Sequence, residues 1–192
     1  MEVIKIKGSR YLHDLIEAVL VYEAREVRKR LKTKYSHPLL RQYRLDNARQ
    51  EVILFRENPE DYPYPFVFAD VVWFVHKNGG GRGSVVHEVK TGRFSLPGAL
   101  AKYARAGAMI NNYPVAPLKQ GNTLFCLWTW KKNLERELLL AREFGLERSS
   151  NFMRKMLRAG LFRICYLEWI EDLILDAVKE VNEVVNYGNP RH

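Results

Sequence analysis

Two apolar, β-rich runs separated by a glycine-rich turn constrain the fold of this chain more than any other part of its sequence. Residues 67–76 and 84–90 are rich in Val, Phe and Trp, and the turn KNGGGRG lies between them. Such runs at this separation are typical of a β-hairpin. Asp70, Glu88 and Lys90 interrupt the apolar runs. Because burying an unpaired charge costs several kcal/mol, these three charges need a partner or a metal.

The expected register of the hairpin gathers the three charges on one face. With the turn centred on Gly80, Asp70 lies opposite Lys90. Glu88 shares the face of Lys90, because side chains two apart on a strand point the same way. A β-bulge in the turn would shift this register by one residue. The opposite face then carries residues that suit a core, namely Val71, Trp73, His87 and Val89.

Two acids and a lysine held on rigid strands suit metal-assisted hydrolysis of a phosphodiester. Carboxylates bind hard cations such as Mg²⁺, which prefer oxygen ligands. A bound metal lowers the pKa of a water and offsets charge in the transition state. Lys90 would hold or deprotonate that water, or neutralise developing charge. A partly exposed salt bridge between Lys90 and the acids explains the same residues, and spacing alone does not choose, since matches to so short a pattern are common by chance.

Composition points to one soluble domain with a polyanionic partner. The 192 residues are enough for a proper core, and 31 Lys and Arg against 22 Asp and Glu leave a formal charge of +9. This excess favours nucleic acid or an acidic membrane surface as a partner, although solubility alone would also explain it. Cys126 and Cys165 each lie in an apolar run, which indicates buried thiols in a reducing cytosol. We find no membrane span or signal peptide and therefore expect an intracellular, cytoplasmic protein.

Hydrophobic periodicity along the chain predicts a mixed α/β order. Apolar residues at helical spacing give a first helix at about residues 12–32, followed by an irregular polar stretch. Ser95 and Pro97 resemble an N-cap and first helical turn. The remaining expected elements are strands at 51–55, 122–130 and 161–167 and helices at 98–112, 133–145, 150–160 and 168–185.

The hairpin motif resembles a known family. The run ADVVWFV followed at hairpin distance by HEVKTG is similar to the core signature of the PD-(D/E)xK nuclease superfamily, which includes restriction endonucleases, archaeal Holliday junction resolvases and RecB-type exonuclease domains. The order of elements over residues 9–130 also resembles the αβββαβ core of that family. The resemblance implies a restriction-endonuclease-like α/β fold, with a mixed central sheet flanked by helices. Residues 131–192 would then form a helical C-terminal extension of one domain spanning residues 1–192.

The resemblance also implies an activity and its residues. Asp70 and Glu88 would be metal ligands, the carbonyl of Val89 a further ligand, and Lys90 the catalytic lysine. The implied function is a Mg²⁺- or Mn²⁺-dependent deoxyribonuclease that hydrolyses DNA phosphodiester bonds. Many members act as dimers, so a homodimer is one state that the resemblance allows, but no dimer surface is recognisable.

Departures from the family pattern leave the subfamily open. Ala69 stands where the signature has proline, which is a common variation. Thr91 and Gly92 look most like the RecB-type variant. That variant often carries Gln and Tyr four apart on the next helix, and here Tyr103 is present but Ala99 stands in place of Gln.

The first helix offers further candidates, because the family usually adds an acid, and sometimes a histidine, from this helix. His13 and Glu17 lie four apart and hence on one side of it. Glu23 projects into the middle of the apolar stripe, where a carboxylate would reach the metal from above. Spacing does not choose between Glu17 and Glu23. Local ion pairs with the basic residues nearby are the alternative, namely Arg25, Arg28, Lys29 and Arg30.

Candidate DNA contacts fall in three places. Arg82 lies in the hairpin turn, and Lys102, Tyr103 and Arg105 lie on the following helix, which in this fold is close to the cleft. A solvated helical face is the alternative for these residues. Residues 138–164 look like a winged-helix segment, although packing against the core explains the same pattern. Its groove-facing residues would be Ser150, Arg154, Lys155 and Arg158.

Two other functions remain open. A catalytically inactive DNA-binding module on the same fold would keep the basic charge but would not need Asp70, Glu88 and Lys90 together. A winged-helix DNA-binding regulator would bind specific sequences without metal, and it leaves the charged hairpin unexplained. The sequence does not distinguish an exonuclease from an endonuclease.

Overall fold

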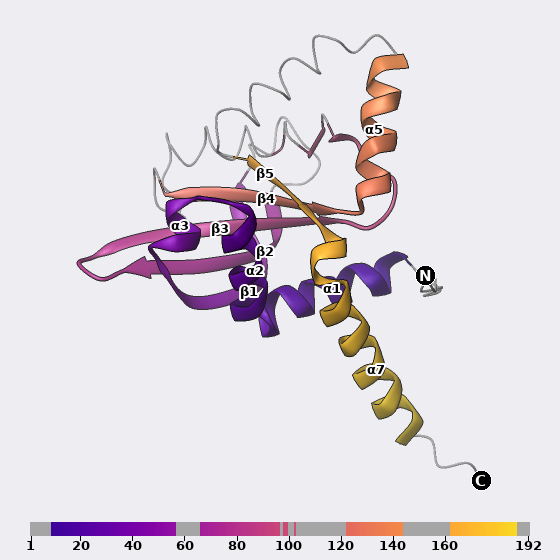
Figure 1. The fold of residues 1–192 in the computed structure, drawn as a ribbon, viewed down its shortest axis with the longest axis horizontal. Coiled ribbons are helices and arrows are strands. Elements are labelled where there is room, and N and C mark those ends of the chain that lie inside the picture. Colours follow the sequence, from indigo (N-terminus) through magenta and orange to yellow (C-terminus); the bar gives the residue numbers. More distant parts are fainter. Residues whose placement is uncertain are drawn as a thin grey trace.

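The computed structural model describes residues 9–56, 66–96, 98, 99, 102, 122–143 and 162–187 (Figure 1). The helices and strands, in chain order, are α1 (Ser9–Tyr22), α2 (Ala24–Lys34), α3 (Pro38–Arg41), β1 (Arg44–Arg56), β2 (Phe66–Lys77), β3 (Gly81–Lys90), β4 (Thr123–Thr129), α5 (Lys131–Glu143), β5 (Phe162–Tyr166), a 3₁₀ turn (Leu167–Ile170) and α7 (Glu171–Tyr187).

The strands form one five-stranded mixed sheet in the order β1-β2-β3-β4-β5. β1, β2 and β3 are antiparallel neighbours, whereas β4 runs parallel to β3 and β5 runs parallel to β4. Helices flank this sheet, so the predicted α/β class is confirmed.

Each face of the sheet buries its own hydrophobic cluster. Side chains of α1, α2, α3 and α7 pack on one face against alternate residues of the strands, including Trp73 and Trp128. The other face buries Val72 and Val86 against Leu96 and against Leu134 of α5. Figure 1 shows α1, α2 and α7 on the same side of the sheet, with α5 near one end of β4. The strands β2 and β3 are thus covered on both faces of the sheet.

The hairpin forms, but its register differs from the expected one. Lys77 pairs with Gly81 and Val71 with His87, so the turn consists of residues 78–80 and is centred one residue before Gly80. Gly79 and Gly80 have φ values of 98° and 101°, which other residues rarely adopt, and this explains the glycines. The partner of Val71 is therefore shifted by two residues. Because side chains alternate with a period of two, this shift leaves the paired residues 71–77 and 81–87 on their expected faces.

The first helix is not continuous, contrary to our expectation. α1 ends at Tyr22 and α2 begins at Ala24, with Glu23 at φ −98° and ψ 19° between them. Glu23 is exposed. The expectation that it faces the core was therefore wrong. In an unbroken helix its charge would have been buried within the apolar stripe, and the break turns it to solvent, which avoids that cost.

Residues 44–50, which were expected to be irregular, form the first half of β1. Most of their side chains are exposed, which is why the apolar signal of a strand is missing. β1 is an edge strand in the sheet order, and polar outer residues are usual there.

The C-terminal third contributes to the central sheet. β5 pairs with β4, and Cys165, Ile170 and Ile174 belong to the same buried cluster as α1. The expected core boundary near residue 130 therefore falls inside the sheet. β5 is a sheet strand and does not form the wing of a winged helix. The predicted helix 150–160 lies outside the described residues.

Several local expectations agree with the structure. The Oγ of Ser95 accepts a hydrogen bond from the N–H of Gly98 at 3.1 Å, as an N-cap would, and most of the helix that follows lies outside the described residues. Cys126 and Cys165 are free and buried, as expected. None of the described helices is both long and apolar enough to cross a membrane.

His87 is fully buried between two tryptophans. Its ring lies 4.0 Å from that of Trp73, and the Nε1 of Trp128 donates to its Nδ1 at 2.9 Å. Its Nε2 has no hydrogen-bond partner among the described residues. Burial lowers the pKa of His87 to about 3. The imidazole is therefore neutral in the folded protein.

This neutral histidine should make stability depend on pH. Below its usual pKa of 6.5, the unfolded chain protonates His87 whereas the folded protein does not. The unfolded state then binds more protons, so stability falls as pH falls from 6.5 toward 3. We expect this group to remove about 1.5–2 kcal/mol of unfolding free energy between pH 6.5 and about 5. Urea denaturation at several pH values measures the unfolding free energy of the wild type and of His87→Gln. If that free energy falls equally with pH in both proteins, His87 is not the group responsible.

Candidate active site

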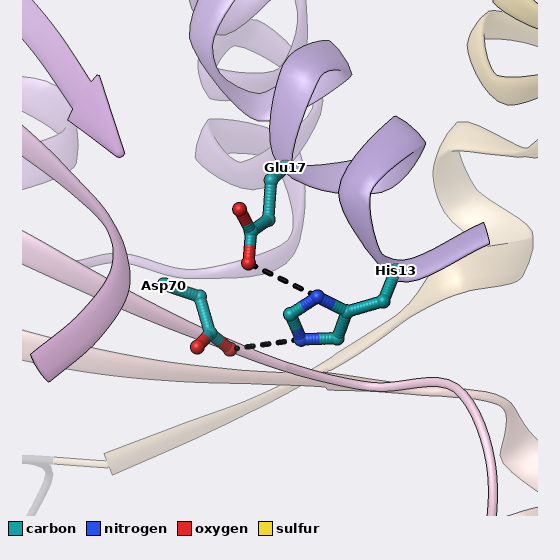
Figure 2. A group of neighbouring side chains, drawn as sticks. All are labelled: His13, Glu17 and Asp70. Carbon is teal, nitrogen blue, oxygen red and sulfur yellow. Dashed lines mark ion pairs between the residues drawn. The ribbon is translucent and has the colours of Figure 1, made fainter. Parts of the chain in front are cut away.

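Helix α1 carries two polar side chains over the sheet. Leu15, Ile16 and Val19 are buried against the strands and fix the rotation of the helix. His13 and Glu17, four residues apart, then point toward β2 (Figure 2). The Glu17 side chain is only 10% exposed and that of His13 28%. A carboxylate is thus buried next to an imidazole.

His13 connects two carboxylates. Its Nδ1 lies 3.0 Å from Oε1 of Glu17, and its Nε2 lies 3.4 Å from Oδ2 of Asp70, as Figure 2 shows. Each of the three residues offers one atom that could bind a metal ion, and these three atoms lie within 4.8 Å of one another. The hydrogen bond with Asp70, followed by that with Glu17, raises the pKa of His13 to about 10. The imidazole is therefore a cation between two acids.

Asp70 lies where β2 and β3 stop pairing. Val71 and His87 are the last residues in register, and beyond them Oδ2 of Asp70 accepts the N–H of Val89 at 2.6 Å. Burial alone would raise the pKa of Asp70. The hydrogen bonds from His13 and Val89 and the charge of Lys90 outweigh it, so the pKa is lowered and the group is a carboxylate.

Glu88 is a second buried acid, 2% exposed, near the end of β3. Its Oε1 lies 2.6 Å from the ammonium of Lys90, and its Oε2 lies 2.8 Å from that of Lys102. The side chains of the two lysines are 32% and 27% exposed. Two cations that reach solvent thus hold one carboxylate that does not.

The structure brings several predicted residues together. Asp70 binds the backbone N–H of Val89, the residue between Glu88 and Lys90, so all four form one continuous group. Of the two acids proposed on the first helix, Glu17 joins this group through His13. The exposed Glu23 is not part of the cluster.

The predicted DNA contacts are placed only in part. Arg82 is exposed beside the hairpin turn. Lys102 was expected to meet phosphates, and here its ammonium pairs with Glu88. The other candidates, Tyr103, Arg105, Ser150, Arg154, Lys155 and Arg158, lie outside the described residues.

Sequence reasoning missed two contributors to the site. Gln50 of β1 donates from Nε2 to Oε2 of Glu17 at 3.4 Å. The contact of Lys102 with Glu88 was also not foreseen. Both contacts join separate elements, so no local spacing could have revealed them. The polar character of residues 44–50 was the only available signal for Gln50, and it indicated an irregular segment.

The fold and site define an α/β protein with a carboxylate–histidine cluster where two central strands diverge. Comparison with protein-family models, with curated proteins and with solved structures gives no match to this chain. Its function therefore has to be inferred from the chemistry of these side chains.

Proposed function

We propose that this protein is a metal-dependent deoxyribonuclease with a restriction-endonuclease-like core, hydrolysing DNA phosphodiester bonds with Mg²⁺ or Mn²⁺. One observation carries the proposal. The His13–Glu17–Asp70 cluster meets the Glu88–Lys90 pair through the hydrogen bond from Val89 to Asp70. The carboxylates and the lysine that this chemistry needs are therefore adjacent.

The donor set fits a divalent cation. Asp70 and Glu17 offer carboxylate oxygens and His13 offers a ring nitrogen, all within 4.8 Å. A cation at this position would replace the proton that His13 now holds between the two acids, because an imidazole must be neutral to bind metal. Oxygen ligands suit Mg²⁺ and Mn²⁺, and softer first-row metals accept imidazole more readily. This donor set therefore favours Mn²⁺ over Mg²⁺.

The remaining residues have distinct parts in the proposed reaction. When bound, the metal supplies Lewis acidity and a water of lowered pKa. Lys102 holds one oxygen of Glu88 and keeps that carboxylate in place. Lys90, beside Glu88 and partly exposed, orients the attacking water or offsets charge on the phosphate.

An inactive DNA-binding module is the main alternative, and the buried acids argue against it. Three carboxylates, Glu17, Asp70 and Glu88, converge at the site, and their ion pairs engage His13, Lys90 and Lys102, cations that a DNA-binding surface would direct at phosphates. A module that only binds DNA gains nothing from them. The net charge of +9 supports a DNA partner in either case.

The cellular compartment that we propose follows from the cysteines. Two free, buried cysteines favour a reducing compartment, and we propose the cytoplasm.

The proposed reaction also bears on the oligomeric state. Cleavage of both strands of a duplex would require two such sites, which a homodimer would supply.

The decisive experiment measures cleavage of labelled DNA by the purified protein. Single-stranded, duplex, flapped and four-way-junction DNA are incubated with Mg²⁺, Mn²⁺ or EDTA. We expect metal-dependent cutting that falls at least about 100-fold in Glu88→Gln, because that variant removes the charge at the site. Glu180→Gln, which changes an exposed acid of α7, is the matched control and should cut normally. Binding without cutting under every metal would replace this proposal with the inactive module.

His13 should control how tightly the metal binds. In His13→Ala we expect the Mn²⁺ concentration needed for half-maximal cleavage to rise at least about tenfold, since one donor is lost. The preference for Mn²⁺ over Mg²⁺ should also shrink. The control is His76→Ala, a partly exposed histidine of β2 that pairs with Asp46. Unchanged metal dependence in His13→Ala would remove His13 from the ligand set.

A further inference from the structure

A second functional feature lies at the β5 edge of the sheet. β5 is the last strand in the sheet order. An open, shallow cavity of about 540 Å³ lies around it. We call it the β5-edge cavity. It is lined by Lys34, Tyr35, Phe162, Arg163, Ile164, Tyr166 and Trp169.

Aromatic rings dominate its walls. The ring of Trp169 lies 5.9 Å from that of Tyr35 and 5.1 Å from that of Tyr166, each in an edge-to-face arrangement. The hydroxyl of Tyr35 donates to the carbonyl of Ile164, which anchors the ring against the strand. All three rings are half-buried. They therefore form a fixed aromatic surface that still reaches solvent.

Two cations accompany these rings. The Nζ of Lys34 lies 5.4 Å from the ring centroid of Trp169, and the guanidinium of Arg163 lies 5.3 Å from that of Tyr35. No acidic residue is among the described residues that line the cavity. The cavity thus offers flat rings and positive charge together, which suits a planar group joined to an anion.

The cavity and the candidate active site share one end of the sheet. Lys90 is in register with Thr129 on β4, and Thr129 is in register with Tyr166 on β5. Lys90 and Tyr166 are therefore two strand spacings apart across the sheet, a backbone-to-backbone distance of about 10 Å. One short stretch of nucleic acid strand can therefore reach both.

We propose that the β5-edge cavity binds an unpaired base and the adjoining phosphate of single-stranded DNA. The naming of DNA as the ligand rests on the proposed function. An unpaired base stacks on aromatic side chains, whereas a base inside a duplex keeps its faces against its neighbours. Lys34 and Arg163 offset the negative charge of the DNA phosphates. The cavity gives the protein a preference for single-stranded DNA or for the unpaired part of a junction.

The test measures DNA binding in EDTA, so that cleavage plays no part. Fluorescence anisotropy compares a labelled oligothymidylate with a blunt duplex of equal phosphate number. Trp169→Leu should weaken single-strand binding about tenfold and leave duplex binding within about twofold, because the stacking surface is lost. Lys34→Gln should weaken single-strand binding and reduce its salt slope by about one. Lys179→Gln, which changes an exposed lysine of α7, is the control and should bind as the wild type does.

Two results would overturn the assignment of the β5-edge cavity to single-stranded DNA. One is equal affinity of the wild type for single strand and duplex. The other is unchanged single-strand binding in Lys34→Gln and Trp169→Leu. Thermal denaturation checks the fold of each variant, and if Trp169→Leu unfolds, the exposed Lys34 decides the question. A wild-type dimer that Trp169→Leu dissociates would show that a second copy occupies the cavity. Because binding is measured without metal, failure of the nuclease assay and failure of this proposal are separate results.

Discussion

Lys90→Ala is expected to lower the rate of metal-dependent DNA cleavage at least about 1000-fold while leaving the fold and DNA affinity nearly unchanged. The ammonium lies 2.6 Å from Glu88 and is partly exposed, so it can act on a water or on a phosphate. Positioned charges and proton donors of this kind contribute about 10²–10⁴ in rate. Initial rates with saturating Mn²⁺ measure the effect.

Two matched variants separate catalysis from structure. Lys77→Ala removes an exposed lysine at the end of β2 and should cut at the normal rate. Lys102→Ala removes the other cation of Glu88, and its loss of rate should be smaller than that of Lys90→Ala. If Lys90→Ala instead unfolds the protein, Lys90 is a structural partner of a buried acid. Cleavage at the wild-type rate would remove it from the catalytic group.

Asp70→Asn is expected to weaken Mn²⁺ binding at least about tenfold, measured by calorimetry, because the central ligand of the cluster loses its charge. The amide oxygen can still accept the N–H of Val89, so the hairpin should stay intact. Asp176→Asn, an exposed acid paired with Lys179, is the control. Unchanged heats of binding would exclude Asp70 as a ligand.

The same variant has a second, metal-free readout. The hydrogen bond with Asp70 is the largest cause of the raised pKa of His13. In Asp70→Asn the pKa of His13 should therefore fall from about 10 toward its usual value, as an NMR titration of the imidazole would show. A pKa that stays near 10 would mean that Glu17 alone holds the proton.

The sheet part of the site was predictable from local pattern. Asp70, Glu88 and Lys90 were assigned to one group, although the assumed register was wrong by two residues. A shift of two residues preserves the face of each paired side chain, and beyond the paired residues the hydrogen bond from Val89 to Asp70 joins the group. The neutral, buried His87 was likewise expected on the core face and is found there.

The helix part of the site was only half predictable. The spacing of His13 and Glu17 is local, and it correctly placed both on one side of α1. The choice between Glu17 and Glu23 depended on where the helix breaks, and the apolar stripe continues on both sides of that break. Packing of two separate helices, which periodicity does not encode, exposes Glu23.

The sequence by itself determined which side chains share a face, because strand and helix periods are properties of adjacent residues. It therefore determined the hairpin, its acids and its lysine. Only the tertiary structure brought His13 to Asp70, Lys102 to Glu88, and Tyr35, Tyr166 and Trp169 into one cavity. These contacts join residues far apart in the chain, and they depend on how helices and strands pack over the whole sheet.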